Sequence, residues 1–455
     1  MRESTARAFM FTGIGISTMV IRILVILALV PIVLVISGIP GRAAEPIDVH
    51  CLVYLDENED GQHQPQEPGL PGVRVTNGVD VLSTDAMGSV DLQVDPDDYR
   101  FVTMTISSGY WPTDAWYHRL DSTTSRADTV RFGLRPAPEL SGNSFRWIHI
   151  ADTQINSLMY YPLAADIQAM NRLELPPVFI VNTGDIVNDG HVRAEWEYYL
   201  DQMSVSEIPV FNVVGNHDDD SNELSLALYE EYVGPPYYSF DIGDWHFITF
   251  NTWRRYIHTP SQAEWLDRDA AQAPPGSRLV VFEHFSLRYG FPEVLQQFVD
   301  LGIQAVFSGH HHFINLSTHP AGIGDYSMVW PRGGGRDWTP RSYSLVSCHE
   351  DGSIDFEIKR LLIDHRTILT SPASEDATCG PEVPILVQAY DSAAAPVDLT
   401  AHMYDPSGIP LEVVPLSREG ISLWRGAFST DGWPTGEYRI EVHGNFDGVI
   451  TESCG

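Results

Sequence analysis

Residues 210–218 of the sequence are Val-Phe-Asn-Val-Val-Gly-Asn-His-Asp, a short apolar run that ends in a glycine and three polar residues. The run is rich in β-branched and aromatic side chains, which favours a buried strand. Gly215 lets the backbone turn sharply, so that the next side chains can point back toward the strand end. The segment therefore predicts a strand with chemically useful side chains just beyond its carboxyl end.

Four other apolar runs end in the same way. They are followed by Asp152 and Gln154, by Gly184 and Asp185, by His284, and by Gly309, His310 and His312. Amphipathic stretches at residues 163–174 and 262–273 lie between them, and Ser261 and Glu264 form a capping box that starts the second stretch. This alternation predicts a sheet-centred α/β unit, in which the loops at the carboxyl ends of the strands meet at one crevice.

The side chains that would meet in this crevice are carboxylates, amides and imidazoles. Such a mixture suits Mn, Fe or Zn better than Ca or a metal that prefers thiolates. A single Gly-Asp turn or a lone histidine would be weak evidence, because both are common in purely structural roles. Five such elements in order, each at the end of a strand, predict a metal site.

In chain order the motifs are D-x-Q, G-D, G-N-H-D, H and G-H-x-H. This series resembles the calcineurin-like metallophosphoesterase superfamily over residues 143–366. The resemblance implies a four-layer α/β core with two facing mixed sheets flanked by helices. It also implies a metal-dependent phosphoric ester hydrolase, which cleaves phosphomonoesters or phosphodiesters with metal-activated water.

The resemblance further implies a binuclear centre of two divalent or trivalent ions, Mn, Fe or Zn. The ligands of the first ion would be Asp152, Gln154 and His312. The ligands of the second ion would be Asn216, His284 and His310. Asp185 would bridge the two ions. The family's first motif usually reads D-x-H, so Gln154 departs from it, and a neutral amide oxygen at that position favours Mn or Fe.

Three further residues are given roles beside the metals. The resemblance implies that His217 faces the substrate without binding metal, and that Asp218 orients it. Arg288 follows His284 closely in the sequence, and we expect it to contact a phosphate of the substrate.

Two all-β modules flank the α/β unit. Residues 46–137 and 381–455 contain short strand-like runs separated by turn residues, with no helical period, so each predicts a β-sandwich. Linkers are predicted at residues 136–142 and 370–381. The N-terminal module is similar to the collagen-adhesin B-like β-sandwich that is often attached to exported calcineurin-like phosphoesterases.

The N-terminal module contains a calcium-loop pattern. Asp56, Asn58, Asp60, Gly61 and Glu67 satisfy the twelve-residue pattern D-x-N-x-D-G-x5-E. A strand-like run precedes the loop and prolines follow it, so a helix-loop-helix hand is not expected. The pattern predicts a structural Ca site, with a metal-free acidic turn as the alternative.

The first 45 residues have the composition of an export signal. Arginines precede an apolar run at residues 23–36, and Gly41, Ala43 and Ala44 offer a cleavage site just before Glu45. We therefore expect a secreted, periplasmic or cell-surface protein. The alternative is retention through residues 19–36 as a membrane anchor.

Four cysteines allow three disulfide pairings in an exported protein, and a bridge from Cys379 to Cys454 is favoured because these two bracket the last module. Free, buried thiols are the alternative.

Charge and composition exclude several classes of partner. The net charge is −34, and Lys359 is the only lysine, so a Walker-type phosphate loop is excluded. The negative field argues against binding duplex nucleic acid. The expected substrate is a phosphorylated small molecule, nucleotide or lipid, and hydrolysis of a nucleotide diphosphate linkage or phospholipid head group is kept as an alternative. A non-catalytic surface interaction protein is a third reading.

Overall fold

The computed structural model describes most of the chain beyond residue 45. The described residues are 46–95, 98–120, 129–156, 163–173, 175–219, 225–252, 260–287, 292–328, 341–361, 365–372, 382–391, 396–419, 423–434, 438–446 and 449–454. The predicted signal segment lies outside them. Within the described ranges, no helix is long and apolar enough to cross a membrane.

The central unit contains two mixed sheets. The first has the order β11-β10-β9-β18-β19, with β9 (Phe145–Ile150), β10 (Ile180–Asn182) and β11 (Val210–Asn212) parallel, and β18 (Ser342–Cys348) and β19 (Ile354–Arg360) antiparallel. The second has the order β12-β13-β14-β15-β17-β16. Its strands are β12 (Tyr238–Ile242), β13 (Trp245–Thr249), β14 (Arg278–Phe282), β15 (Ala305–Ser308), β16 (Asn315–Thr318) and β17 (Gly324–Ser327).

The two sheets face each other across an aromatic core. Trp147 on β9 lies 5.2 Å from Phe282 on β14 and 4.7 Å from Phe307 on β15, measured between ring centroids. Phe211 on β11 stacks on Phe240 of β12 at 3.9 Å. Burying such large apolar side chains from both inner faces is the main stabilising term of this layer. The predicted pair of facing mixed sheets is confirmed.

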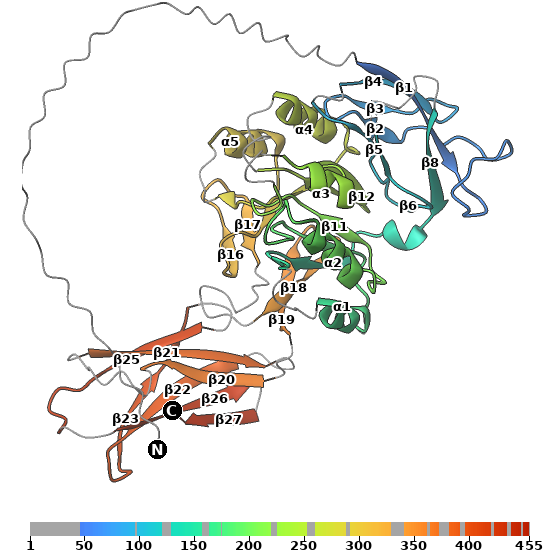
Figure 1. Ribbon diagram of the computed structural model, residues 1–455. Coiled ribbons are helices and arrows are strands. Elements are labelled where there is room, and N and C mark those ends of the chain that lie inside the picture. The colour runs from blue at the N-terminus through green and yellow to red at the C-terminus, as the bar shows by residue number, and fades with distance from the viewer. Residues whose placement is uncertain are drawn as a thin grey trace, which may run out of the picture. The chain divides into compact units, whose positions relative to one another are not determined.

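Within the described residues, five α-helices supply the outer layers of the central unit. They are α1 (Leu163–Asn171), α2 (Arg193–Met203), α3 (Ala227–Tyr232), α4 (Pro260–Gln272) and α5 (Pro292–Leu301). Trp196 of α2, Trp265 of α4 and Phe298 of α5 are completely buried in one cluster with residues of the strands. Figure 1 shows α4 beside α5 and, elsewhere on the unit, α1 beside α2. The four-layer α/β architecture is therefore present.

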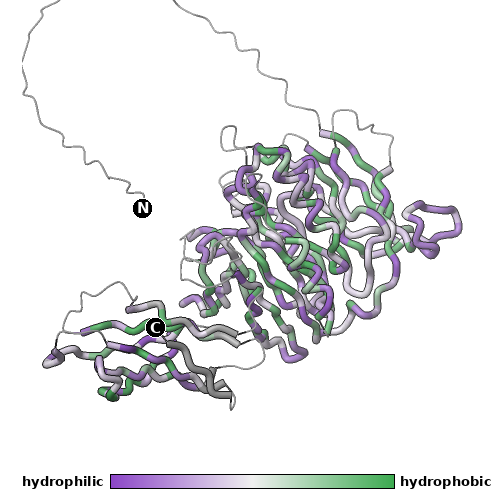
Figure 2. Tube along the Cα trace, turned by 60° about the horizontal axis from the view of Figure 1, so that its bottom comes forward, coloured by the Kyte–Doolittle hydropathy of each residue, from purple (hydrophilic) through white to green (hydrophobic). Residues whose placement is uncertain are grey.

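The N-terminal unit is a β-sandwich. One sheet has the order β4-β1-β8-β6 and the other β3-β2-β5-β7. The strands are β1 (Ile47–Leu55), β2 (Arg74–Thr76), β3 (Val81–Ser83), β4 (Ser89–Val94), β5 (Phe101–Met104), β6 (Tyr110–Pro112), β7 (Tyr117–Arg119) and β8 (Thr129–Pro136). The loop of residues 56–67 projects from this unit as a hydrophilic segment (Figure 2).

The N-terminal sandwich shares its core with the central unit. Tyr99 and Phe101 are buried in the cluster that holds the helices of the central unit. The segment predicted as a linker, residues 136–142, is packed instead of extended: it forms the short helix η1 (Pro138–Leu140), and Leu140 is buried against the aromatic core. Ile106 also bridges Phe240 in a β-type contact. The first two units therefore pack as one body.

A buried charge network crosses this junction. Arg74 on β2 forms an ion pair with Asp241 on β12. The imidazole of His246 lies between two carboxylates, 2.7 Å from Asp241 and 2.8 Å from Asp269, and is fully buried. Burial alone would lower the pKa of His246, but Asp269 and Asp241 outweigh it and raise the pKa to about 9.

Stability should therefore fall at alkaline pH. Because the folded pKa of His246 lies above the unfolded value of about 6.5, its contribution is fully present below about pH 6.5 and is lost as the pH rises through about 9. The loss is expected to be on the order of 3 kcal/mol. Urea unfolding of residues 46–455, followed by tryptophan fluorescence between pH 6.5 and 10, measures it. A His246→Gln variant with the same slope of stability against pH would contradict the assignment to His246.

The C-terminal unit is a second β-sandwich with its own core. Its sheets have the orders β20-β21-β25-β24 and β23-β22-β26-β27. The strands are β20 (His365–Ser371), β21 (Glu382–Asp391), β22 (Pro396–Tyr404), β23 (Pro410–Pro415), β24 (Ser417–Arg418), β25 (Leu423–Ser429), β26 (Arg439–Phe446) and β27 (Val449–Cys454). Strand β20 pairs with β21 and so lies in this sandwich, although it precedes the segment predicted to start it.

Two of the four cysteines are free and buried. Cys51 lies in the N-terminal core and Cys348 in the aromatic core, and burial raises the pKa of each thiol to about 12. Cys379 and the side chain of Cys454 lie outside the described residues, so their bridge stays a prediction.

Candidate metal centre

The predicted site residues lie at the carboxyl ends of five strands from both central sheets. Asp152 follows β9, Asp185 follows β10 and His217 follows β11 in the first sheet. His284 follows β14 and His310 follows β15 in the second sheet. Because the two central sheets face each other, these loops meet at one edge of the central unit.

The backbone at this edge is strained at the predicted ligands. Six residues other than glycine have a left-handed φ angle in the described chain, and five of them are predicted ligands. These five are Asp152 (56°), Gln154 (41°), Asp185 (52°), His310 (66°) and His312 (56°), and the sixth is Glu59 (59°). A left-handed conformation costs a residue with a Cβ about 1–2 kcal/mol. Such strain gathers where surrounding structure holds side chains in a functional arrangement.

Asp185 is shared by two clusters of potential ligands. Asp152, Asp185 and His312 offer one ligand atom each within 4.8 Å of one another, and so do Asp185, His284 and His310. His284 Nε2 lies 3.2 Å from Asp185 Oδ1, and His312 Nε2 lies 3.4 Å from Asp152 Oδ1. Within the described part of the chain, these are the two groups of Asp, Glu, His and Cys side chains that could hold a metal.

His284, which follows a strand of the second sheet, is oriented by a backbone group that follows a strand of the first sheet. His284 Nδ1 donates to the carbonyl oxygen of Thr183 at 2.8 Å. A carbonyl can only accept, so Nδ1 carries a proton and Nε2 is the atom that faces the cluster, where the neutral ring would offer its lone pair to a metal. Nε2 also lies 3.2 Å from the amide oxygen of Asn216. This contact brings the third predicted ligand of the second ion next to His284.

The two carboxylates fit a bound cation. Asp152 and Asp185 are 0% and 1% exposed. In the described chain their ion pairs are all with histidines, so no arginine or lysine supplies a permanent positive charge there. Burial raises the pKa of Asp152. At Asp185 burial acts in the same direction, but His284 and His217 together outweigh it and lower the pKa of that carboxyl to about 2. Buried carboxylates are stable when a cation neutralises them.

The structure corrects the role predicted for Asp218. Its carboxylate does not contact the His217 ring but accepts three backbone N–H groups, from Ile186 at 2.8 Å, Val187 at 3.1 Å and Gly215 at 2.7 Å. The ring is oriented instead by the carbonyl of Asn188, 2.7 Å from His217 Nδ1. Asp218 thus ties the loop after β10 to the loop after β11.

The glycines serve two different purposes. Gly184 has a φ of 93°, so it makes the predicted sharp turn. A Cβ on Gly215 would lie 2.0 Å from the Asp185 nitrogen, and a Cβ on Gly309 would lie 2.9 Å from an Asp152 oxygen. At these two positions glycine is therefore needed for the close approach of neighbouring loops rather than for a left-handed turn.

Comparison with known proteins agrees with this geometry. Residues 145–313 match the family model described as calcineurin-like phosphoesterase. They form a calcineurin-like metallophosphoesterase domain. The domain match and the two groups of potential ligands both fit a metal-dependent phosphoesterase domain.

Individual relatives match parts of the chain. The serine/threonine-protein phosphatase CPPED1 of Bos taurus is 31% identical over 182 residues, which cover 32% of this chain and 56% of the relative. The chain thus spans little more than half the length of that phosphatase. A probable cyclic nucleotide phosphodiesterase of Xenorhabdus bovienii is 40% identical over 62 residues, 13% of this chain and 23% of the relative. The purple acid phosphatase PPD1 from yellow lupin is 14% identical, with a TM-score of 0.36, and covers 87% of this chain and 73% of its own.

Gln154 departs from its predicted role in one detail. Its amide nitrogen lies 3.4 Å from Asp185 Oδ2, so nitrogen rather than oxygen is turned toward the shared carboxylate. A half-turn of the terminal amide would exchange the two atoms without moving the rest of the side chain. The residue lies at the metallophosphoesterase centre, and binding through oxygen requires that turn.

Several groups at the centre carried no signal in the sequence. The carbonyls of Thr183 and Asn188 orient two histidines, and any residue type has a carbonyl. Ser286 contacts His311 at 2.9 Å between Oγ and Nε2, and both follow predicted ligands by one or two positions. Arg288, the predicted phosphate contact, lies outside the described residues.

The acidic loop of the N-terminal unit is held by its own hydrogen bonds. Asp56 accepts from the Gly61 backbone at 2.8 Å and from the Thr113 hydroxyl at 2.6 Å. Glu67 accepts from the backbone of Gln64 at 2.8 Å. None of the metal-binding groups found in the described chain lies in this loop. The Ca site therefore stays a prediction beside the metal-free turn.

Thermal unfolding decides between a Ca site and a metal-free acidic turn in this loop. If the loop binds Ca, adding the ion at about 100 times its dissociation constant should stabilise residues 46–455 by about 2.7 kcal/mol, and Asp56→Asn should remove the shift. A midpoint unchanged by Ca in the unsubstituted chain would leave only the acidic turn.

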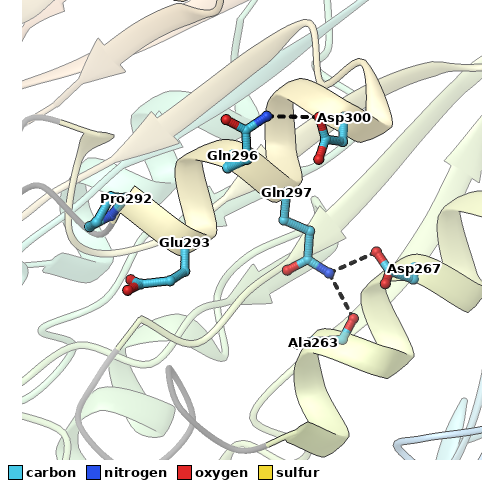
Figure 3. A pocket seen from close by; sticks show the side chains of 7 residues that line it. All are labelled: Ala263, Asp267, Pro292, Glu293, Gln296, Gln297 and Asp300. Atoms are coloured by element: carbon cyan, nitrogen blue, oxygen red, sulfur yellow. Dashed lines mark hydrogen bonds between the residues drawn. The ribbon is translucent and has the colours of Figure 1, made fainter.

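A surface hollow of about 730 Å³ lies between α4 and α5 (Figure 3). It is lined by Ala263, Asp267, Pro292, Glu293, Gln296, Gln297 and Asp300. Gln297 bonds to Ala263 and Asp267 across the gap, at 2.8 Å each. These contacts join the two helices, and none of the predicted site residues lines the hollow.

Proposed function

We propose that the metallophosphoesterase domain hydrolyses phosphomonoesters or phosphodiesters at a binuclear metal centre. Asp152, Gln154 and His312 hold one ion of Mn, Fe or Zn. Asn216, His284 and His310 hold the other, and Asp185 holds both. The observation that carries this proposal is the membership of Asp185 in both ligand clusters, together with the left-handed backbone at five of the seven ligands.

The chemistry divides between the ions and the protein. A pair of bound ions supplies a water of lowered pKa and polarises the phosphoryl oxygen. His217 acts as the proton donor. Its Nδ1 donates to Asn188, so Nε2 is the atom left to face the substrate, 3.9 Å from Asp185 Oδ2. When protonated, Nε2 donates to the leaving oxygen.

The position of His217 is set by two loops. Its backbone nitrogen donates to Asp185 Oδ1 at 2.8 Å. Asp218 then holds the start of the same loop through Gly215. These contacts fix the position of His217 relative to Asp185. Holding a proton donor in a fixed position beside the metal site contributes to the rate.

The relatives favour two substrate classes. Their names describe a serine/threonine-protein phosphatase and a probable cyclic nucleotide phosphodiesterase, so a phosphorylated side chain and a cyclic nucleotide join the simple esters as candidates. Nucleotide diphosphates and phospholipid head groups remain alternatives on the same fold, since fold does not fix substrate. A non-catalytic role for the domain is disfavoured because every expected ligand position is filled.

The test is hydrolysis by purified residues 46–455. The panel comprises p-nitrophenyl phosphate, bis-p-nitrophenyl phosphate, a phosphoserine peptide, cyclic nucleotides and nucleoside diphosphates, each with Mn, Fe or Zn added back. We expect turnover of at least one phosphoester that depends on added metal. No turnover on the whole panel, in protein that demonstrably binds metal, would refute the proposed activity.

We further propose that the protein is exported, because of the arginines, apolar run and small residues in its first 45 positions. When the chain is expressed in a secreting bacterial host, it should appear outside the cytoplasm. Its mass should be that of a chain that begins at Glu45. An intact chain in the membrane fraction would instead support an anchor at residues 19–36, and an uncut cytoplasmic chain would contradict export.

A further inference from the structure

The strand that leads into the His217 loop lies at the edge of its sheet. Among the strands that the structure describes, β11 pairs with β10 alone. Its last residue, Asn212, is four positions before Asn216 and five before His217. An unpaired strand edge is held by whatever covers it. The groups that cover this edge therefore control where the two site residues lie.

Three tyrosine hydroxyls cover it by converging on Asn212. Tyr238 on β12 accepts from the Asn212 nitrogen at 3.0 Å and donates to its carbonyl at 2.9 Å. Tyr229 on α3 donates to the same carbonyl at 3.2 Å, and Tyr199 on α2 donates to the Asn212 side chain at 2.6 Å. Tyr238 makes both backbone bonds that a neighbouring strand would otherwise make.

The N-terminal sandwich packs directly on this clamp. The ring of Trp116 lies 4.5 Å from the ring of Tyr238 and 6.5 Å from that of Phe211, the residue before Asn212. Trp111 lies 6.4 Å from Phe211. Trp116 also packs against the N-terminal core, so one side chain connects that core to the clamp.

We propose that the N-terminal sandwich is a positioning element for the metallophosphoesterase centre, acting from Trp116 through Tyr238 and Asn212 on the loop Gly215–Asp218. Trp116 packs against the Tyr238 ring and holds it in place. The Tyr238 hydroxyl in turn holds the end of β11, and the loop that follows this strand carries Asn216 and His217. The sandwich is thus part of the catalytic machinery's support rather than a separate binding module. This rests on the proposed function for its kinetic consequence, but not for its structural one.

The interface contains a matched control. Tyr117, next to Trp116, also donates its hydroxyl to a carbonyl of the central unit, that of Val233, at 3.1 Å. Val233 caps α3 and donates its backbone nitrogen to the Tyr229 carbonyl, so this bond holds the end of α3 and is not one of the hydroxyl contacts to Asn212. Tyr238→Phe and Tyr117→Phe therefore each remove one hydroxyl near the same junction, and only the first breaks the clamp.

Hydrogen exchange tests the structural step without any need for activity. In metal-loaded residues 46–455, Trp116→Ala and Tyr238→Phe should raise amide exchange in residues 210–219 about tenfold. Residues 305–313, which carry ligands on another strand, should exchange as in the unsubstituted chain. Tyr117→Phe should leave both segments unchanged, and Trp116→Phe should restore most of the protection.

Kinetics tests the functional step. Trp116→Ala and Tyr238→Phe should each lower kcat about tenfold with KM within about twofold, since small misplacements of a catalytic group are costly. If both act through one path, the double variant should be no slower than the slower single variant, whereas independent effects would multiply.

The outcomes separate this inference from the proposed function. Unchanged exchange in residues 210–219 for Trp116→Ala and Tyr238→Phe, or an equal rise in Tyr117→Phe, would overturn the inference. So would full kcat in both clamp variants of an active enzyme. If the unsubstituted chain hydrolyses no phosphoester, the proposed function fails, while the exchange result still decides whether the sandwich positions the loop.

Discussion

Replacing Asp185 by asparagine is expected to abolish metal-dependent phosphoester hydrolysis. Asp185 belongs to both ligand clusters, so the substitution removes the one negative charge that the two ions would share. The expected loss in kcat/KM is about 10³-fold or more, which corresponds to about 4 kcal/mol of transition-state stabilisation. Activity assays with saturating Mn, combined with metal analysis of the purified protein, measure both the rate and the number of bound ions.

Asp189→Asn is the matched control for this variant. Asp189 lies four residues later in the same loop, with its side chain 40% exposed and paired with His191. The control should keep near-normal activity and metal content. If Asp185→Asn keeps two ions and full activity, Asp185 does not bridge them.

His217→Ala should separate catalysis from metal binding. We expect kcat to fall roughly 10²–10⁴-fold, the usual contribution of a positioned proton donor. The metal content should stay unchanged, because His217 contacts Asn188 and Asp185 rather than the ligand histidines. Turnover with a substrate whose leaving group needs no proton, such as p-nitrophenolate, should fall less than turnover of an alkyl ester.

His191→Ala provides the comparison for this prediction. Its side chain is 45% exposed and lies on the same stretch of chain. It should leave kcat within about threefold of the unsubstituted value, as expected for a surface substitution. Loss of metal in His217→Ala would contradict its placement as a residue that faces the substrate, and equal losses on both leaving groups would contradict its role as proton donor.

The sequence was most informative where a local signal suffices. An apolar run followed by Gly-Asp or by Gly-Asn-His-Asp predicts a strand and the side chains at its end, and Asp185 and His217 lie there. Parallel strands bring such ends together by geometry alone. The two facing sheets and the meeting of the five loops could therefore be predicted from the sequence.

Contacts between residues far apart in the chain could not be predicted in the same way. Asp218 is adjacent to His217, so the resemblance suggested a contact, but its carboxylate is used by three backbone groups instead. The orienting carbonyls of Thr183 and Asn188 leave no trace in residue type. Only the folded chain shows which backbone acceptor a ring meets.

Module boundaries were the other weak point. Residues 136–142 have the proline and glycine content of a linker, yet Leu140 is buried against the aromatic core. Likewise, β20 joins the C-terminal sandwich by pairing across residues 373–381. Composition reports turns, and it does not report whether the turns are packed. The same ambiguity hid the junction through which Trp116 reaches Tyr238.

Anomalous diffraction from crystals of residues 46–455 grown with Mn tests the binuclear centre most directly. We expect two ions about 3.5 Å apart, the separation of a two-metal site, each bound to an oxygen of Asp185. Asp152 and His312 should contact one ion, and His284 and His310 the other. A single ion without Asp185 as ligand, or no ion within reach of these side chains, would rule out a binuclear centre bridged by Asp185.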